Sequence, residues 1–582
     1  MSRTAKRLIC PLNNLRSGTA YPASRKQVRE DVLNEEEQLY LVGKARTMPG
    51  TANELQSASN RYHQNGAAEK VLGAVYTPPR VAAALTRWAV RSASDKVLDP
   101  SSGEGVFMSA ARTRLADLGA RRPQCVGVDV HAQTAAATGA VCEDFFSWVR
   151  SAPKFDVVVG NPPFIRSHLF PEGSRRLAFG EMVRMGLKPS RLMSTWAPFL
   201  AVCCSVLVPT GRLAMVIPEE LLHVGYAQEL REFLVRRFRR VIVCLPSHEI
   251  FQEVQQAVVL LICDNENAAE SGLLSIEYPA LEEGDFDDLT PAEPWAWNPK
   301  WTHLFLTAQE RRLVNQWWPR LDWRPFRAYG RVEVGVVTGD NDFFVLDEDQ
   351  AGAFGEKHLM PIVGGAKDLR GITFGADDFR RILSEKRPAF LLRLEAPVDQ
   401  LPKPIRAYLE LGEQRNVNQR YKCRIRDPWY AVPSAWESDA LLLRQAGEMP
   451  RLVHLAKKCT ATDTVHRVTW DRPSFGKRHS VSFINTWTLM ASELTGRSYG
   501  GGVLELMPSE ANRLPLPEPS AALDDIFEAV DERVRSRNFY DALALVDEVV
   551  MPGWMSRGAR QSAENILAKL IKRRKTRYHA NH

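Results

Sequence analysis

The stretch FDVVVGNPPFI, residues 155–165, joins a run of β-branched residues to a short segment that could perform chemistry on a flat ring carrying an amine. Asn161 and Pro162 offer a side-chain amide oxygen and a backbone carbonyl close together. The rings of Pro162 and Pro163 restrict the backbone, and Phe164 can stack on a flat base. Two acceptors would take both N–H groups of an exocyclic amine and direct its lone pair at an electrophile, which favours amine methylation. The alternative is a strand end broken by prolines.

A glycine-rich turn with an acid precedes this tip in the chain. Asp99 opens DPSSGEGVF directly after the apolar residues KVL, as expected where a strand leads through a turn into a helix. Gly103 and Gly105 would let a ligand approach the backbone, where a Cβ would collide. Taken alone, such a turn is also compatible with ordinary packing.

Two further acids follow, each at the end of a short apolar or aromatic segment. Asp129 ends VGVDV, the position from which a doubly wound sheet accepts hydrogen bonds from ribose hydroxyls. Asp144 precedes Phe145 in CEDFF, so that a carboxylate for an adenine amine stands beside an aromatic ring. Solvated acids and a core phenylalanine are the alternatives. The order of the three acidic segments before NPPF favours a nucleotide-like cofactor.

These residues need a sheet to bring them together. Buried strands are predicted from the runs KVLDP, CVGVDV, FDVVVG, GRLAMVIP, VIVCLP and AVVLLIC. Helical stretches, such as RVAAALTRWAV and STWAPFLAVCCSVLV, lie between or before them. The pattern predicts an α/β fold with a mostly parallel sheet covered on both faces.

Composition suggests several parts and no membrane segment. The chain has 582 residues, and its net charge of +7 is compatible with a polyanionic partner. Its nine cysteines include no CxxC pair, which is compatible with a reducing cytoplasm and argues against a metal site. No signal peptide and no apolar run of the ~20 residues that span a bilayer is visible. The predicted parts are a polar N-terminal extension (1–70), a catalytic domain (71–265), a linker or arm (266–303), a second, α+β domain (304–520) and a helical end with a basic tail (521–582).

The motifs DPSSGEG, VGVDV, CEDFF and NPPF, with GAVYTPPRVAAAL upstream, resemble those of S-adenosylmethionine-dependent DNA adenine-N6 methyltransferases. Their order resembles the gamma class, and in particular the TaqI and Eco57I group. The resemblance covers roughly residues 70–265 well. It implies a Rossmann-like S-adenosylmethionine-binding sheet, a C-terminal target-recognition domain and double-stranded DNA as partner.

The resemblance also implies a role for each matching position. The tetrapeptide ends in Phe rather than the commoner Tyr, and Ser101–Ser102 stand where the family often has small residues or Cys. The cofactor would be held at its methionine end by Tyr76 and Thr77, by the loop residues Asp99, Gly103 and Gly105, at its ribose by Asp129, and at its adenine by Asp144 and Phe145. The flipped target adenine would be held by Asn161, Pro162, Pro163 and Phe164, with Phe251 a further candidate for which a core position is the alternative.

In the C-terminal half the resemblance is patchier. RYKCRIRDPWYAVP interleaves charge with aromatic residues, as a groove that follows phosphates would. The candidate DNA contacts are Lys422, Arg424, Arg426, Trp429 and Tyr430. A basic solvated strand with a core Trp is the alternative. The basic run KRRK, 572–575, would add nonspecific attraction to phosphates or be solvated.

We therefore expect a site-specific DNA adenine methyltransferase of a restriction-modification or phage-defence system, with a separately encoded endonuclease as a candidate partner. An RNA or protein amide methyltransferase is disfavoured because those enzymes are generally shorter and lack both GAVYTPP and a large basic C-terminal domain. A nuclease carried on the same chain is disfavoured because the first 70 residues hold no convincing PD…(D/E)xK set. A DNA-binding scaffold with an idle methyltransferase fold is the remaining alternative.

Overall fold

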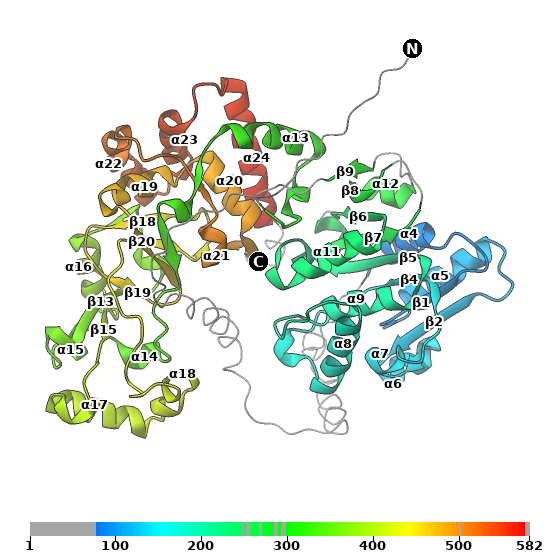
Figure 1. The fold of residues 1–582 in the computed structure, drawn as a ribbon, viewed down its shortest axis with the longest axis horizontal. Helices are drawn as coiled ribbons and strands as arrows, with labels where there is room; N and C mark the ends of the chain where they lie inside the picture. The colour runs from blue at the N-terminus through cyan, green and yellow to red at the C-terminus, as the bar shows by residue number, and fades with distance from the viewer. Residues whose placement is uncertain are drawn as a thin grey trace, which may run out of the picture. The chain divides into compact units, whose positions relative to one another are not determined.

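A computed structural model describes residues 77–246, 248–251, 257–266, 270–284, 289–292, 298–499 and 502–576 (Figure 1). The expected N-terminal extension and Tyr76 lie outside these residues. None of the helices in the described ranges has both the length and the apolar composition that crossing a membrane requires.

The N-terminal part of the described chain is built on one large sheet. Within the described residues this sheet has nine strands in the order β3-β2-β1-β4-β5-β7-β6-β8-β9. The strands are β1 (Lys96–Asp99), β2 (Gln124–Asp129), β3 (Val141–Cys142), β4 (Phe155–Gly160), β5 (Leu207–Pro218), β6 (Arg240–Cys244), β7 (Val258–Asp264), β8 (Gly272–Ile276) and β9 (Thr290–Pro291).

Most of the sheet is parallel, because helices connect its successive strands. β1 pairs in parallel with β2 and β4, and β4 pairs in parallel with β5. β7 runs antiparallel between β5 and β6. The chain moves from β1 to one side for β2 and β3, and returns to the other side for β4 and β5. Ligands of such sheets bind outside the carboxyl ends of the strands at this reversal, here between β1 and β4. The predicted α/β fold with a mostly parallel sheet is confirmed.

Helices cover both faces of the sheet. α4 packs against α5 on one face, and α7 packs against α9 on the other, as right-handed crossovers in opposite directions require. The helices of this part are α4 (Pro79–Ala89), α5 (Val106–Asp117), α6 (Ala132–Thr138), α7 (Phe145–Trp148), α8 (Glu172–Arg184), α9 (Trp196–Val206), α10 (Glu220–His223), α11 (Gln228–Arg237) and α12 (Tyr278–Glu283).

The segment 266–303, predicted as a linker or arm, instead contributes elements to this domain. β8 pairs in parallel with β6 along its whole length, and β9 pairs with β8. α12 packs against α4. The acidic and Pro-rich composition of the segment suggested an irregular connection, but the apolar residues of β8 are buried as an extension of the sheet.

The C-terminal part is a mixture of small sheets and helices, consistent with the predicted α+β class. In the described chain its main sheet has the order β11-β20-β16-β18-β14, and a second has the order β12-β15-β13-β19. The strands are β10 (Arg324–Pro325), β11 (Gly330–Glu333), β12 (Val345–Leu346), β13 (Leu359–Val363), β14 (Thr373–Phe374), β15 (Phe390–Leu392), β16 (Ala440–Leu443), β17 (Gln445–Ala446), β18 (Leu452–Leu455), β19 (Thr460–Ala461), β20 (Val465–Trp470), β21 (Arg497–Tyr499), β22 (Val503–Glu505) and β23 (Pro515–Leu516).

The helices of this part cluster in two places along the chain. Those from α19 onward enclose a core that includes Trp487 and Phe527, while α14, α17 and α18 share a separate core around Phe343 and Phe344. They are α13 (Ala308–Trp317), α14 (Asn341–Phe344), α15 (Glu348–Ala351), α16 (Ala376–Ser384), α17 (Lys403–Gln414), α18 (Tyr421–Arg424), α19 (Gly476–Ser482), α20 (Thr486–Thr495), α21 (Pro508–Ala511), α22 (Ala522–Arg535), α23 (Phe539–Val550) and α24 (Arg557–Thr576).

The basic run at the chain's end belongs to α24 and is engaged in internal ion pairs. Arg574 is 3% exposed and pairs with the buried Glu493 at 2.9 Å. Its guanidinium also donates to the backbone carbonyls of residues 447, 448 and 502. Arg573 pairs with Glu219, which follows β5. These residues therefore tie α24 to other elements rather than forming a solvated tail.

Candidate active site

The tip after β4 lies at the reversal point of the sheet, beside the end of β1. Gly160 ends β4, which pairs in parallel with β1, and a Cβ at Gly160 would lie 2.8 Å from Oδ1 of Asp99, too close for a side chain. The hydroxyl of Ser101 donates to the backbone carbonyl of Asn161 at 3.0 Å. The glycine-rich turn and the NPPF tip are therefore joined into one structure.

The amide of Asn161 is held by a residue from the start of the domain. Its Nδ2 donates to Oγ1 of Thr77 at 3.0 Å. Thr77 is 4% exposed and lies just before α4. The resemblance assigned Thr77 to the methionine end of the cofactor, and its contact to Asn161 adds a second role, because the bond helps to hold the amide in place.

Thr195 holds the other side of the tip. Its hydroxyl donates to the carbonyl of Pro163 and accepts from the backbone N–H of Ile165 at 2.9 Å. Its own N–H donates to the carbonyl of Ile165 at 3.0 Å. Thr195 is the N-cap residue of α9, yet its side chain makes no capping bond. A hydroxyl that would normally cap a helix is used here to fix the loop.

Asp99 is a buried acid at the centre of this arrangement. It is 1% exposed, and Oδ1 accepts from the N–H of Ser101 at 3.3 Å. Burial, with a smaller repulsion from Asp129, raises the pKa of Asp99 to about 7. Such a carboxyl is poised to ionise when a cationic group arrives.

Asp129, at the end of β2, holds the glycine-rich turn in place. Its Oδ2 accepts from the N–H of Gly103 at 2.9 Å, and its Oδ1 accepts from the N–H of His131 at 2.8 Å. Gly103 has φ of +47° and Gly105 has φ of +81°, a region that side chains with a Cβ rarely adopt. The glycines are thus required by the backbone of the turn.

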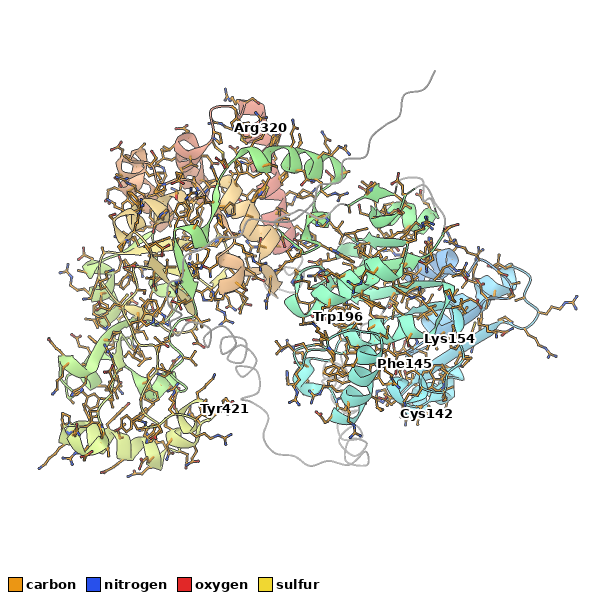
Figure 2. All side chains as sticks on the ribbon, in the orientation of Figure 1. Cys142, Phe145, Lys154, Trp196, Arg320 and Tyr421 are labelled. Atoms are coloured by element: carbon orange, nitrogen blue, oxygen red, sulfur yellow. The ribbon has the colours of Figure 1, made fainter. Side chains whose placement is uncertain are left out.

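The CEDFF segment is built into the fold more fully than the sequence suggested. Asp144 caps α7, where Oδ1 accepts from the N–H of Ser147 at 3.1 Å. Its Oδ2 accepts from the hydroxyl of Ser174 on α8 at 2.7 Å. The ring of Phe145 is 3% exposed and stacks on Phe199 at 5.0 Å (Figure 2). An adenine amine would share Asp144 with these donors, since each carboxylate oxygen can accept more than one hydrogen bond.

Two predicted aromatic contacts of the target base are buried. Phe164 is 7% exposed and Phe251 is 6% exposed, and both belong to the core of the catalytic domain. Phe251 ends a short 3-10 helix, His248–Phe251. Both side chains lie in the core, and base stacking by either of them stays a prediction.

The five predicted DNA contacts of the C-terminal part divide into two groups. Arg426 donates to the carbonyls of residues 337 and 338, Trp429 donates to Glu413 at 3.2 Å, and Tyr430 donates to the carbonyl of residue 396 at 3.0 Å. These three therefore support the domain's interior. Lys422 and Arg424 instead flank Tyr421 on α18, which is a helix and not the solvated strand that was the alternative.

Sequence reasoning missed several residues of the site. Ser174 and Thr195 come from elements whose position relative to the tip is fixed only by the tertiary fold. Glu220 supports the neighbouring helix, because its Oε2 accepts from Trp196, the residue after Thr195, at 3.2 Å and from Tyr226 at 2.9 Å. The only local sequence feature that could have pointed to Thr195 is the Ser-Thr pair before α9. Among the described residues, no cluster of three or more His, Cys, Asp or Glu side chains could hold a metal ion.

Two family models match the chain. "Eco57I restriction-modification methylase" matches residues 129–251, and "Type II methyltransferase M.Eco57I, C-terminal domain" matches residues 298–551. The first contains Asp129, Asp144, the NPPF tip and Phe251.

Individual relatives agree with these models. "Type II methyltransferase M.AccI" of Acinetobacter calcoaceticus is 23% identical over 384 residues, 61% of this chain and 68% of that protein. "Type II methyltransferase M.XamI" of Xanthomonas campestris pv. amaranthicola is 23% identical over 473 residues, 76% of this chain and 85% of that protein. Among solved structures, that of the Type IIL restriction-modification enzyme MmeI with DNA aligns at 12% identity and a TM-score of 0.45, over 95% of this chain and 76% of MmeI.

The two family models come from one group of enzymes and follow one another in the order that the motifs predict. The chain belongs to the Eco57I-like restriction-modification methyltransferases.

Proposed function

We propose that the protein transfers a methyl group from S-adenosylmethionine to N6 of an adenine flipped out of double-stranded DNA, as a gamma-class methyltransferase. The observation that carries the proposal is the joining of two strand ends at the reversal point of the sheet. There the buried Asp99 lies so near Gly160 that a side chain at position 160 would collide with it, next to Asn161 and Pro162. The proposed site for a cationic cofactor and the proposed site for an amine-bearing ring would thus adjoin.

The residues of the first site fit the cofactor. Asp99 is buried with a pKa of about 7, so a bound ammonium or sulfonium group would stabilise its ionised form. Gly103 and Gly105 keep side chains out of the turn, and Asp129 lies where ribose hydroxyls are held in doubly wound sheets. S-adenosylmethionine supplies an electrophilic methyl group on a sulfonium sulfur.

The residues of the second site would act by positioning. The oxygen of the Asn161 amide and the carbonyl of Pro162 would accept hydrogen bonds from the two N–H groups of the adenine amine. The lone pair of the amine nitrogen would then point away from these two acceptors. Thr77 fixes the amide of Asn161, while Ser101 and Thr195 fix the backbone on either side of it. Catalysis by orientation needs such a rigid loop. The proton of the methylated amine would leave to solvent.

The matched C-terminal region supports a division of labour along the chain. We propose that residues 71–265 carry catalysis and that residues 304–520 read the DNA sequence. The relatives M.AccI and M.XamI carry the name of type II methyltransferases, which supports DNA as the substrate. A separately encoded endonuclease is the proposed partner.

The proposal is tested by incubating the purified protein with S-adenosylmethionine labelled in its methyl group and with DNA from a host that lacks adenine methylation. Label in N6-methyladenine after digestion of the DNA to nucleosides is the expected result. Label in cytosine, or in RNA or protein only, would contradict it.

A further inference from the structure

A basic tip, residues 415–426, projects a set of cations from the C-terminal part. The twelve residues of RNVNQRYKCRIR include five basic side chains and no acid. They begin after α17 and include α18. The basic residues are Arg415, Arg420, Lys422, Arg424 and Arg426. A cluster of this sign attracts a polyanion.

The basic tip is fixed firmly to the turn at residues 337–341. Arg426 donates to the carbonyls of Val337 and Thr338 at 2.7 and 2.8 Å. Arg420 pairs with Asp340, which is 6% exposed, at 2.8 Å. Cys423 is fully buried, at 0% exposure, between these two anchors. The tip therefore presents its remaining side chains from a rigid support.

One of those side chains is a large aliphatic one. Ile425 is 58% exposed, although it stands between the anchored Arg426 and the exposed Arg424. A single exposed aliphatic residue is ordinary on a protein surface. Here its neighbours are cations, so the surroundings would repel a basic protein surface and attract an acidic polymer.

Tyr421 adds a flat ring to the same tip. The Nζ of Lys422 lies 5.9 Å and the Cζ of Arg424 lies 5.5 Å from the centre of its ring. Both cations also stand within three residues of Ile425 in the chain, where they could reach phosphates near an inserted apolar group. Proteins that kink DNA combine such features, with an apolar wedge between two base pairs and basic residues on the backbone.

We propose that Ile425 is an apolar wedge that enters the stack of base pairs, while Lys422 and Arg424 contact the flanking phosphates. The proposal rests on DNA being the substrate. It assigns to the basic tip a second disruption of the duplex, separate from the extrusion of the target adenine at Asn161. The wedge would unstack one base-pair step at a fixed distance from the methylated adenine.

The test uses the full chain and a duplex containing its own methylation site, identified by sequencing DNA methylated by the protein. The fluorescent adenine analogue 2-aminopurine is placed at one position after another. We expect wild-type protein to raise fluorescence at the target adenine and at one further step. Ile425→Ala should lower the rise at that step by about tenfold and keep the rise at the target. Ile425→Leu should keep both.

A matched control is Val398→Ala, because Val398 is also exposed, at 47%, but is followed by the acidic Asp399. It should behave as wild type. Equal fluorescence of wild type and Ile425→Ala at every position would overturn the wedge. So would a change in the oligomeric state of Ile425→Ala with unchanged DNA behaviour, which would assign Ile425 to a protein contact. Failure of the wild type to methylate any DNA would instead overturn the proposed function.

Discussion

The amide nitrogen of Asn161 donates a hydrogen bond of 3.0 Å to the hydroxyl of Thr77, a residue 84 positions earlier in the chain. Since the nitrogen faces Thr77, the amide oxygen lies on the opposite side of the group. The residue proposed to accept from the target amine is therefore held in part by a side chain outside the NPPF motif.

Replacing Thr77 by Val should lower methyl transfer because the amide would lose the bond that orients it. Loss of one such bond corresponds to ~1 kcal/mol, or about a fivefold fall in kcat. Thr77→Ser keeps the hydroxyl and should restore most of the activity. Rates under saturating DNA and S-adenosylmethionine measure the effect. A fall in cofactor affinity with kcat unchanged would mean that Thr77 acts at the cofactor alone.

Asn161→Ala should abolish methyl transfer while binding of S-adenosylmethionine survives, because the cofactor is proposed to contact the neighbouring loop. Calorimetric titration with the cofactor and label transfer to DNA measure the two properties separately. Asn565, exposed on α24, provides a matched control, and its change to Ala should leave both unaltered. Turnover of Asn161→Ala close to that of wild type would contradict the proposed mechanism.

Cofactor binding should depend on the ionisation of Asp99, whose pKa is raised to about 7 by burial. Only the carboxylate attracts a cationic cofactor. Affinity should therefore rise as pH rises to about 7, by up to about tenfold per pH unit below that value, and then level off. Titrations across this range should show the slope in wild type and its loss in Asp99→Asn. A pH-independent affinity of the wild type would contradict a contact between Asp99 and the cofactor.

The same carboxyl should affect stability in the opposite direction. Its pKa in the folded state lies above the value near 4 of an unfolded chain, so the folded state binds more protons between these limits. The contribution of Asp99 to the free energy of unfolding is full below about pH 4 and is lost as pH rises to about 7. Without cofactor, the urea midpoint of Asp99→Asn should therefore rise relative to the urea midpoint of wild type as pH increases through this range. A constant difference between the two proteins would count against the raised pKa.

Much of the catalytic sheet could be predicted because each strand carries its own signal. The apolar runs at residues 96–99, 124–129 and 155–160 are strands β1, β2 and β4, as predicted. Their apolar residues are bounded by turns, and Asp99 and Asp129 end the first two strands. β3 has two residues, both exposed, and so lacks such a signal. β8 lay in a segment whose overall composition resembled a linker.

The contacts that shape the site could not be read from the sequence, because they join distant segments. Thr77 reaches Asn161 and Thr195 reaches Pro163 only after the sheet and its helices have formed. The C-terminal part shows the same difficulty. There Asn512 accepts from the N–H of Val332, 180 residues away, and no local periodicity reports such a pairing.

Arg574 should be important for stability because its buried charge is paired with Glu493 and donates to backbone carbonyls of other elements. Arg574→Ala would leave Glu493 buried without this ion pair and should cost about 3 kcal/mol of the free energy of unfolding. Lys572, exposed two residues earlier on α24, is the matched control, and Lys572→Ala should cost less than ~0.5 kcal/mol.

Urea denaturation followed by tryptophan fluorescence measures both variants. Replacing both members of the pair, as Arg574→Met with Glu493→Leu, should recover much of the loss, since no buried charge is then left alone. Equal unfolding midpoints for Arg574→Ala and Lys572→Ala would show that α24 is not held through this pair.

The NPPF tip is proposed to hold the adenine that is methylated in DNA. The most direct measurement compares wild type with Asn161→Ala in an otherwise unmethylated host and reads modified bases from its DNA. We predict N6-methyladenine at one recurring sequence with wild type and none with Asn161→Ala. The absence of N6-methyladenine with folded, cofactor-binding wild-type protein, or its persistence with Asn161→Ala, would contradict the claim.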